Sequence, residues 1–306
     1  MRGLLWWNTY RRQCALPAAC LSAALVWMAG KHFENAESTG LQKHFTSSAT
    51  VAKERALEEK TGVEAREERT PKEIAETLRT DPRGTQREDR TSVWAFLKNG
   101  EGRKAEKETE WLLGADEALS WLRGAEQAAP EIESGLSSLA LDQNLPPALR
   151  EYALQHLGIW AEEHAAGMQV LETFKQVFLA EKTSSVAGIA LTALFRSCFG
   201  TRETAWIQTQ ATSLASSRDA NPSARAAALQ ILGQKGAPEA EPIARSFMTK
   251  EATIHEKISA LQVLGRVGTS ETLGWLSSFS EEREPLTAAA QRQAVQTLRA
   301  RWRLAN

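Results

Sequence analysis

Cysteine and histidine are both scarce in this chain of 306 residues, which holds three cysteines and five histidines. The cysteines stand at positions 14, 20 and 198, a distribution that fits neither a disulfide framework nor a zinc site. Cys198 falls within a predicted helix, where we expect it to be buried as a small hydrophobic residue. His156 and His164 lie near Glu162 and Glu163, but we expect Gly158 to interrupt the helix between them. We therefore interpret both histidines as structural or surface residues rather than metal ligands.

Sequence signatures of catalysis are missing as well. Histidines at 32, 44, 156, 164 and 255 offer no local arrangement with a serine or cysteine nucleophile. No glycine-rich phosphate-binding loop is present, because the glycines of Gly233–Gly236 belong to a predicted turn at a helix end. The prediction is a non-enzymatic protein with no cofactor and no bound metal.

An excess of one charge is also absent. The chain has 37 basic and 38 acidic residues and a calculated pI of about 6.6. From residue 111 onward there are 18 lysines and arginines against 21 aspartates and glutamates. Nucleic-acid-binding domains usually carry a basic face, so we expect no nucleic-acid partner.

A long run without charge occurs near the N-terminus, at residues 14–30, after a basic segment at 1–13 that contains Arg11 and Arg12. Seventeen residues are at the lower limit for a membrane-spanning helix. No pair of small residues suits signal-peptide cleavage, so we predict an uncleaved anchor with the rest of the chain on the non-cytoplasmic side. The alternative is a cleaved signal peptide and a secreted or periplasmic protein.

Residues 31–110 are rich in charge and poor in apolar side chains, with 33 charged residues among 80. A segment of this composition cannot bury enough surface to fold by itself, which predicts a largely disordered linker with short helices. Thr91–Leu97 carries several large apolar residues, and it could form a short helix that docks on the following domain.

From residue 111 to residue 306 the chain repeats itself at intervals of 32 to 38 residues. Each repeat contains a five-residue core motif that begins with alanine, ends with leucine, and has an aliphatic second and a polar third residue. The six copies are Ala118–Leu122, Ala153–Leu157, Ala190–Leu194, Ala228–Leu232, Ala260–Leu264 and Ala294–Leu298. Self-similarity at this period, without any alternating β-branched run, predicts an all-α solenoid of about five to six helix pairs.

The residue types of the motif fit a second helix packed on both sides. Alanine and leucine four residues apart share one face of a helix, and the aliphatic second position widens that face. Gly158, Gly233 and Gly265 follow the leucine directly, and we expect them to end their helices in left-handed turns. First helices are predicted at 130–142, 168–180, 204–217, 238–250 and 270–280.

The stretches Pro147–Gly158 and Pro222–Gly233, each with an arginine three residues before the motif alanine, resemble the turn and second helix of HEAT and HEAT-like repeats. Asp142 and Asp219 stand where that family often has an acidic turn residue. The resemblance covers roughly residues 111–306. It implies a curved α-solenoid whose second helices line the concave side and hold other proteins.

The polar third position of the motif supplies the candidate binding residues. Stacked second helices would place these side chains next to one another, and a row of neutral amides suits the backbone of an extended peptide. We predict a membrane-tethered scaffold that binds a protein or extended peptide through this row, with no small-molecule substrate. The alternative is a HEAT-like enzyme or nucleic-acid-processing protein, such as a glycosylase or lyase. The row consists of Ser120, Gln155, Thr192, Gln230, Gln262 and Gln296.

Overall fold

The computed structural model describes residue 80 and residues 87–99, 108–125, 128–278 and 284–304. All of them belong to one compact unit, Ala65–Asn306. The described residues form twelve α-helices and no β-strand, which confirms the all-α prediction. The predicted anchor at 14–30 and most of the predicted linker lie outside the described residues. Among those that are described, no helix is both long enough and apolar enough to cross a membrane.

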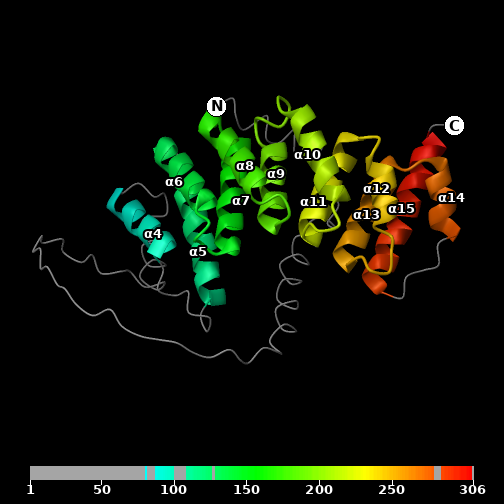
Figure 1. Cartoon of the computed structure of the whole chain (residues 1–306), viewed down its shortest axis with the longest axis horizontal. Coiled ribbons are helices and arrows are strands. Elements are labelled where there is room, and N and C mark those ends of the chain that lie inside the picture. The colour runs from blue at the N-terminus through cyan, green and yellow to red at the C-terminus, as the bar shows by residue number, and fades with distance from the viewer. Residues whose placement is uncertain (1–79, 81–86, 100–107, 126–127, 279–283, 305–306) are drawn as a thin grey trace, which may run out of the picture. The chain divides into compact units, whose positions relative to one another are not determined.

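The helices carry the labels of Figure 1. Their bounds are α4 (Arg87–Asn99), α5 (Glu108–Arg123), α6 (Ala129–Leu141), α7 (Pro147–Glu163), α8 (Met168–Ala180), α9 (Ser185–Arg196), α10 (Thr204–Ser216), α11 (Pro222–Lys235), α12 (Ala240–Ser246), α13 (Ile254–Val267), α14 (Ser270–Ser278) and α15 (Pro285–Leu304).

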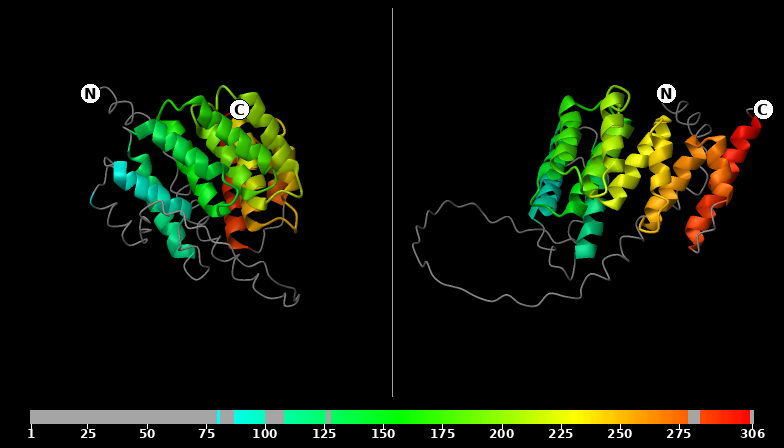
Figure 2. Two further views of the ribbon diagram at one scale, coloured as in Figure 1. Left: turned by 60° about the vertical axis from the view of Figure 1, so that its left-hand side comes forward. Right: turned by 45° about the vertical axis from the view of Figure 1, so that its right-hand side comes forward.

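From α6 onward the helices alternate between two layers. The first helices, α6, α8, α10, α12 and α14, each pack against the helix that follows them in the chain. The second helices, α5, α7, α9, α11, α13 and α15, also pack against one another in chain order, side by side (Figures 1 and 2). All six copies of the core motif lie on second helices. This packing between neighbours is compatible with an α-solenoid.

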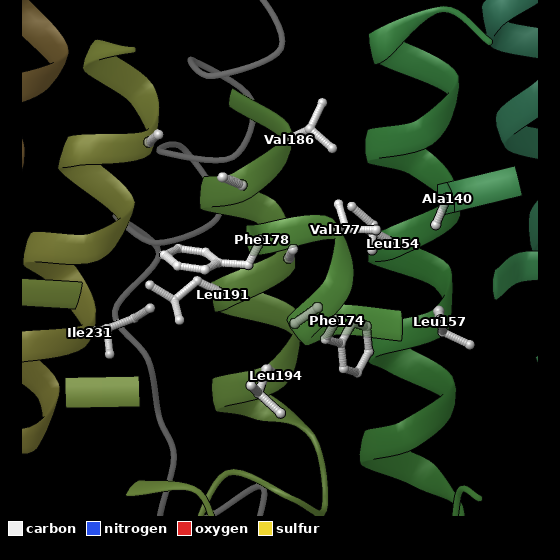
Figure 3. Packing of buried hydrophobic residues seen from close by; sticks show 14 of the residues in the cluster. Ala140, Leu154, Leu157, Phe174, Val177, Phe178, Val186, Leu191, Leu194 and Ile231 are labelled. Atoms are coloured by element: carbon white, nitrogen blue, oxygen red, sulfur yellow. The ribbon is translucent and has the colours of Figure 1, made fainter. Parts of the chain in front are cut away.

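The first and last positions of the motif are core positions, as the sequence predicts. Its alanines are at most 3% exposed, and its leucines are fully buried. Between the second helices, aromatic side chains of the first helices complete the core. Figure 3 shows Phe174 of α8 between leucines of α7 and α9, and Phe178 of α8 beside Leu191 of α9. Burial of one such side chain stabilises the fold by roughly 1.5–3 kcal/mol.

The glycines after the motif do not end their helices, so that prediction is wrong. α7 continues five residues past Gly158, and α11 and α13 also run beyond their glycines. A Cβ atom on Gly158 would lie 2.8 Å from the Ala193 Cβ of α9, and one on Gly233 would lie 2.7 Å from a methyl group of Val263. These glycines therefore allow consecutive second helices to approach closely. Among the described glycines, only Gly236 at the end of α11 has a positive φ.

The short helix predicted at Thr91–Leu97 is present as the longer α4, and it packs on α5. Phe96 and Leu97 are buried in the common core. Glu131 of α6 accepts hydrogen bonds from Arg90 Nε at 3.1 Å and from Trp94 Nε1 at 3.1 Å. The packed helices therefore begin before residue 111, where the sequence pattern places the first repeat.

Cys198 is exposed, which corrects the prediction of a buried cysteine. α9 ends at Arg196, and the Ser197 hydroxyl donates to the Leu194 carbonyl oxygen at 2.8 Å as the chain turns. Phe199 is buried just after this turn. Because the larger apolar side chain occupies the core, the thiol is left at the surface.

Replacement of Gly188 by alanine tests the close approach of the second helices. A Cβ there would lie 2.6 Å from the Ala224 Cα of α11, a backbone atom that cannot move away independently. We expect Gly188→Ala to lower the free energy of unfolding by about 1–3 kcal/mol. Gly274→Ala is the control, because nothing lies within 4 Å of a Cβ at that exposed helical site. It should raise stability by up to about 1 kcal/mol. Equal effects in urea unfolding would contradict the close packing.

A second prediction concerns the start of α15. Burial opposes the charged form of Glu284, but hydrogen bonds from the backbone N–H groups of Thr287 and Leu286 outweigh it, and the pKa of Glu284 is lowered. A lowered folded-state pKa means that its stabilising contribution is present above the unfolded-state pKa and is lost as the pH falls through the folded-state pKa. Glu284→Gln should therefore destabilise the protein at pH 7 and make little difference at pH 2. A difference in stability between variant and parent that is the same at both pH values would contradict this assignment.

Candidate functional site

The candidate row of polar residues lies where the repeat pattern places it, two residues after the motif alanine on each second helix. Its members differ in exposure: three are exposed and three are half-buried. The row is therefore fully exposed to solvent at only half of its positions. Ser120, Gln262 and Gln296 are exposed, and Gln155, Thr192 and Gln230 are half-buried.

Two neighbouring members of the row contact each other directly. Gln230 Nε2 on α11 donates to Gln262 Oε1 on α13 at 2.8 Å. The same nitrogen donates to the Ser259 backbone carbonyl at 3.2 Å. The two amide hydrogens of Gln230 can each donate to one of these oxygens. The Gln230 Oε1 atom and the Gln262 NH₂ group then have no hydrogen-bond partner in the described part of the chain. An acceptor and a donor are thus held together at the surface.

Thr192, by contrast, bonds within its own helix. Its hydroxyl donates to the Gly188 carbonyl oxygen at 2.8 Å. A hydroxyl committed to the preceding turn retains its lone pairs as acceptors but has no proton to offer. The threonine therefore offers an acceptor where the glutamine positions can offer both an acceptor and donors.

Half-buried apolar side chains flank the row on α7 and α9. Tyr152 and Ile189 precede the motif alanine on their helices, and Ile159 and Phe195 follow the motif. Burial raises the pKa of the Tyr152 hydroxyl, and the negative charges of Asp116 and Glu151 raise it further. The tyrosine is therefore neutral at physiological pH. Polar side chains with apolar ones on both sides form a surface that can contact backbone and side chains of the same ligand.

Two arginines, the half-buried Arg225 and the buried Arg150, link the start of a second helix to the repeat that follows it. Arg225 of α11 pairs with Glu256 of α13 at 2.7 Å, and Glu256 completes a capping box with Thr253. The Arg225 guanidinium also lies 4.5 Å from the centre of the Phe247 ring. In the earlier repeat Arg150 bonds the Ala140 carbonyl at 3.0 Å and pairs with Glu181. The repeat pattern of the sequence identifies both arginines as equivalent positions, but it does not predict which acidic residues they pair with.

The histidine cluster of the sequence separates into two unrelated contacts. His156 Nε2 lies 3.0 Å from Asp116 Oδ1 of α5. His164 ends α7 and stacks on the Trp160 ring with 4.1 Å between ring centres. Gly158 does not break the helix between them. In the described ranges, no group of three or more histidine, cysteine, aspartate or glutamate side chains is placed to hold a metal ion.

The bond between Gln230 and Gln262 can be tested by stability. Gln230→Ala should lower the free energy of unfolding by about 1 kcal/mol, because a half-buried amide with two hydrogen bonds is lost. Gln296→Ala serves as the matched control on an exposed site of the same row, and it should change stability by less than about 0.5 kcal/mol. A double-mutant cycle with Gln262→Ala should show a coupling energy. A coupling of zero would mean that the two amides do not interact in solution.

Comparison with known proteins adds no family to this description. No family model matches the chain, and no curated protein matches it.

Proposed function

We propose that this protein is a binding module for an extended segment of another protein, and that the polar row of the second helices is its binding surface. The observation that carries the proposal is the hydrogen bond between Gln230 and Gln262. It links the same motif position on two consecutive second helices, α11 and α13, and so holds two members of the row side by side.

The chemistry of the row suits a peptide backbone. Each peptide unit offers one N–H donor and one carbonyl acceptor, and a glutamine side chain offers the complementary pair. The linked pair leaves the Gln230 oxygen to accept from a ligand N–H and the Gln262 NH₂ group to donate to a ligand carbonyl. Side chains of an extended ligand alternate in direction, so they would reach the apolar residues on either side of the row.

We further propose that the protein is a HEAT-like scaffold held at a membrane. The resemblance of Pro147–Gly158 and Pro222–Gly233 to HEAT-like second helices supports the scaffold. The charge-free run at 14–30 and the basic residues before it support an uncleaved anchor, with the repeats on the non-cytoplasmic side. Under this proposal the charged segment between residue 30 and α4 lets the repeats reach partners at a distance from the membrane.

The binding proposal predicts a graded response to mutation. Each neutral hydrogen bond contributes only about 1 kcal/mol, so single changes at Gln155, Gln230 or Gln262 should weaken binding modestly. The triple change of all three to alanine should abolish binding while the protein stays folded. Peptides selected from a displayed library of random linear sequences on the full chain supply the probe, and fluorescence anisotropy measures their affinity.

The matched control removes three glutamines from first helices, through Gln169→Ala, Gln176→Ala and Gln210→Ala. Circular dichroism and anisotropy are measured on the same samples. The control should bind the selected peptides as the parent does. If the folded Gln155, Gln230 and Gln262 triple variant binds as well as the control, the polar row is not the binding surface.

A further inference from the structure

Charge is distributed unevenly along the layer of second helices. Acidic residues are in excess on the first two, since α5 holds four acidic residues and one arginine, and α7 holds three acidic residues and one arginine. Basic residues are in excess on the next three. α9 has one arginine, α11 has one arginine and one lysine, and α13 has two basic residues and one acidic residue. The net charge therefore changes sign between α7 and α9.

The layer of first helices shows no such change. α6 and α14 are acidic, and α8, α10 and α12 carry no net charge. A surface that only keeps a protein soluble is served by charges of both signs that are interspersed. Because the polar row lies on the second helices, its surroundings are acidic at α5 and α7 and basic from α9 to α13.

On α5 the acidic residues lie beside the polar row. Asp116 and Glu117 are exposed, and they stand four and three residues before Ser120, on the same face of the helix. Asp116 has a structural partner, since it lies 3.0 Å from His156 Nε2. Glu117 stands in the middle of the helix, where the helix dipole gives a charge no stabilising role.

The acidic residues at the end of α7 oppose the helix dipole. Glu162 and Glu163 occupy its last turn, whereas α5, α9, α11 and α13 have a basic residue there. Glu162 stands two turns after Gln155 on the same face, and it pairs with Arg196 at 2.9 Å. Glu163 pairs with Arg123 at 3.4 Å. Ion pairs this exposed contribute little to stability, so folding alone does not explain the two carboxylates.

On α9 and α13 the side chain one turn after the polar row is an arginine. Arg196 follows Thr192 and Arg266 follows Gln262, in each case by four residues and so on the same face. The helix dipole accounts for a cation in the last turn. Both guanidinium groups are nevertheless exposed beside the row, where a ligand can reach them.

We propose that the extended segment bound along the polar row is polarised in charge, with its basic end over α5 and α7 and its acidic end over α11 and α13. This inference rests on the proposed function and specifies the chemistry of its ligand. Packed helices stand about 8–10 Å apart, so the four steps from α5 to α13 cover about 32–40 Å. An extended chain advances about 3.3 Å per residue, which places the basic and acidic residues of the ligand about 10–12 residues apart. Apolar residues between them would face Tyr152 and Ile189.

The test locates the two ends of one designed peptide on the protein. A peptide of about 16 residues covers the span, with a lysine block at one end, alternating valine and serine in the centre, and a glutamate block at the other end. A bromoacetyl group on either the lysine end or the glutamate end gives two probes of the same sequence. They react with the full chain after its three native cysteines are replaced by serine and one new cysteine is introduced, by Ser120→Cys on α5 or Gln262→Cys on α13.

The lysine-end probe should alkylate Ser120→Cys at least about tenfold faster than the glutamate-end probe does, because complementary charge at both ends favours one orientation. At Gln262→Cys the preference should be reversed. Comparison of two probes on the same cysteine removes differences in thiol reactivity between sites. Added salt should weaken both preferences, since exposed charges are screened.

Charge variants test whether the second helices cause the orientation. Glu117→Gln with Arg266→Gln, in either cysteine background, should reduce both preferences at least about threefold. The matched control, Glu172→Gln with Arg218→Gln, removes one charge of each sign from exposed sites outside the second helices and should retain both preferences. Circular dichroism on the same samples establishes that each variant is folded. Equal reductions in the variant and the control would overturn the proposal.

Failure of this inference can be distinguished from failure of the binding function. If peptides bind and the triple change at Gln155, Gln230 and Gln262 weakens them, but both probes label each cysteine equally or with the opposite preference, the ligand is not oriented by charge and only this inference fails. The same holds if peptides selected from the random library bind and the charged peptide does not. If no linear peptide binds the folded chain, the proposed function is wrong and this inference with it.

Discussion

The structure depends on the close contact between consecutive second helices. Where Gly188 meets Ala224 and Gly233 meets Val263, no further atom can be added to the glycine without displacing its neighbour. Such contacts fix both the distance and the relative rotation of two helices, because small side chains leave few other ways to fill the space. Equivalent positions of successive motifs are then brought to equivalent places, and a sequence repeat becomes a row of side chains on one surface.

Ion pairs between repeats join the start of one second helix to the start of the next. Arg225 reaches forward from α11 to the capping glutamate of α13, so the start of one second helix is tied to the start of the next. The pair is largely buried, with 19% and 3% of the side chains exposed, and loss of one partner would leave an uncompensated charge inside the protein. Such a link restricts the register of the repeats as well as joining them.

The helices of the repeats could be predicted well from the sequence, because their apolar periodicity is strong and turn residues separate them. The first helix Met168–Ala180 has the bounds that the pattern predicts, and the alanine and leucine of each motif are buried. The prediction that the glycines end their helices is wrong, because a glycine near a helix end and a glycine at a helix crossing look alike in a single sequence. Only the position of the neighbouring helix distinguishes them.

The candidate site could be predicted in position but not in detail. The motif places Gln230 and Gln262 in one row, yet their mutual hydrogen bond depends on side-chain directions across two helices. The prediction of a buried Cys198 is wrong for a related reason. Local propensity encodes neither the end of α9 at Arg196 nor the burial of Phe199 in the core. Local pattern determines which residues form a helix, and the packing of the whole unit determines which of them reach the surface.

The central claim is that successive motifs stand in register on adjacent second helices. The most direct measurement is cross-linking of Gln230→Cys with Gln262→Cys by a short thiol-specific reagent, in a chain whose three native cysteines are replaced by serine. The account predicts efficient intramolecular cross-linking of this pair and none for Gln155→Cys with Gln262→Cys, since α9 and α11 lie between α7 and α13 in the layer. Equal cross-linking of the two pairs, or none of the first pair in the folded protein, would contradict the register.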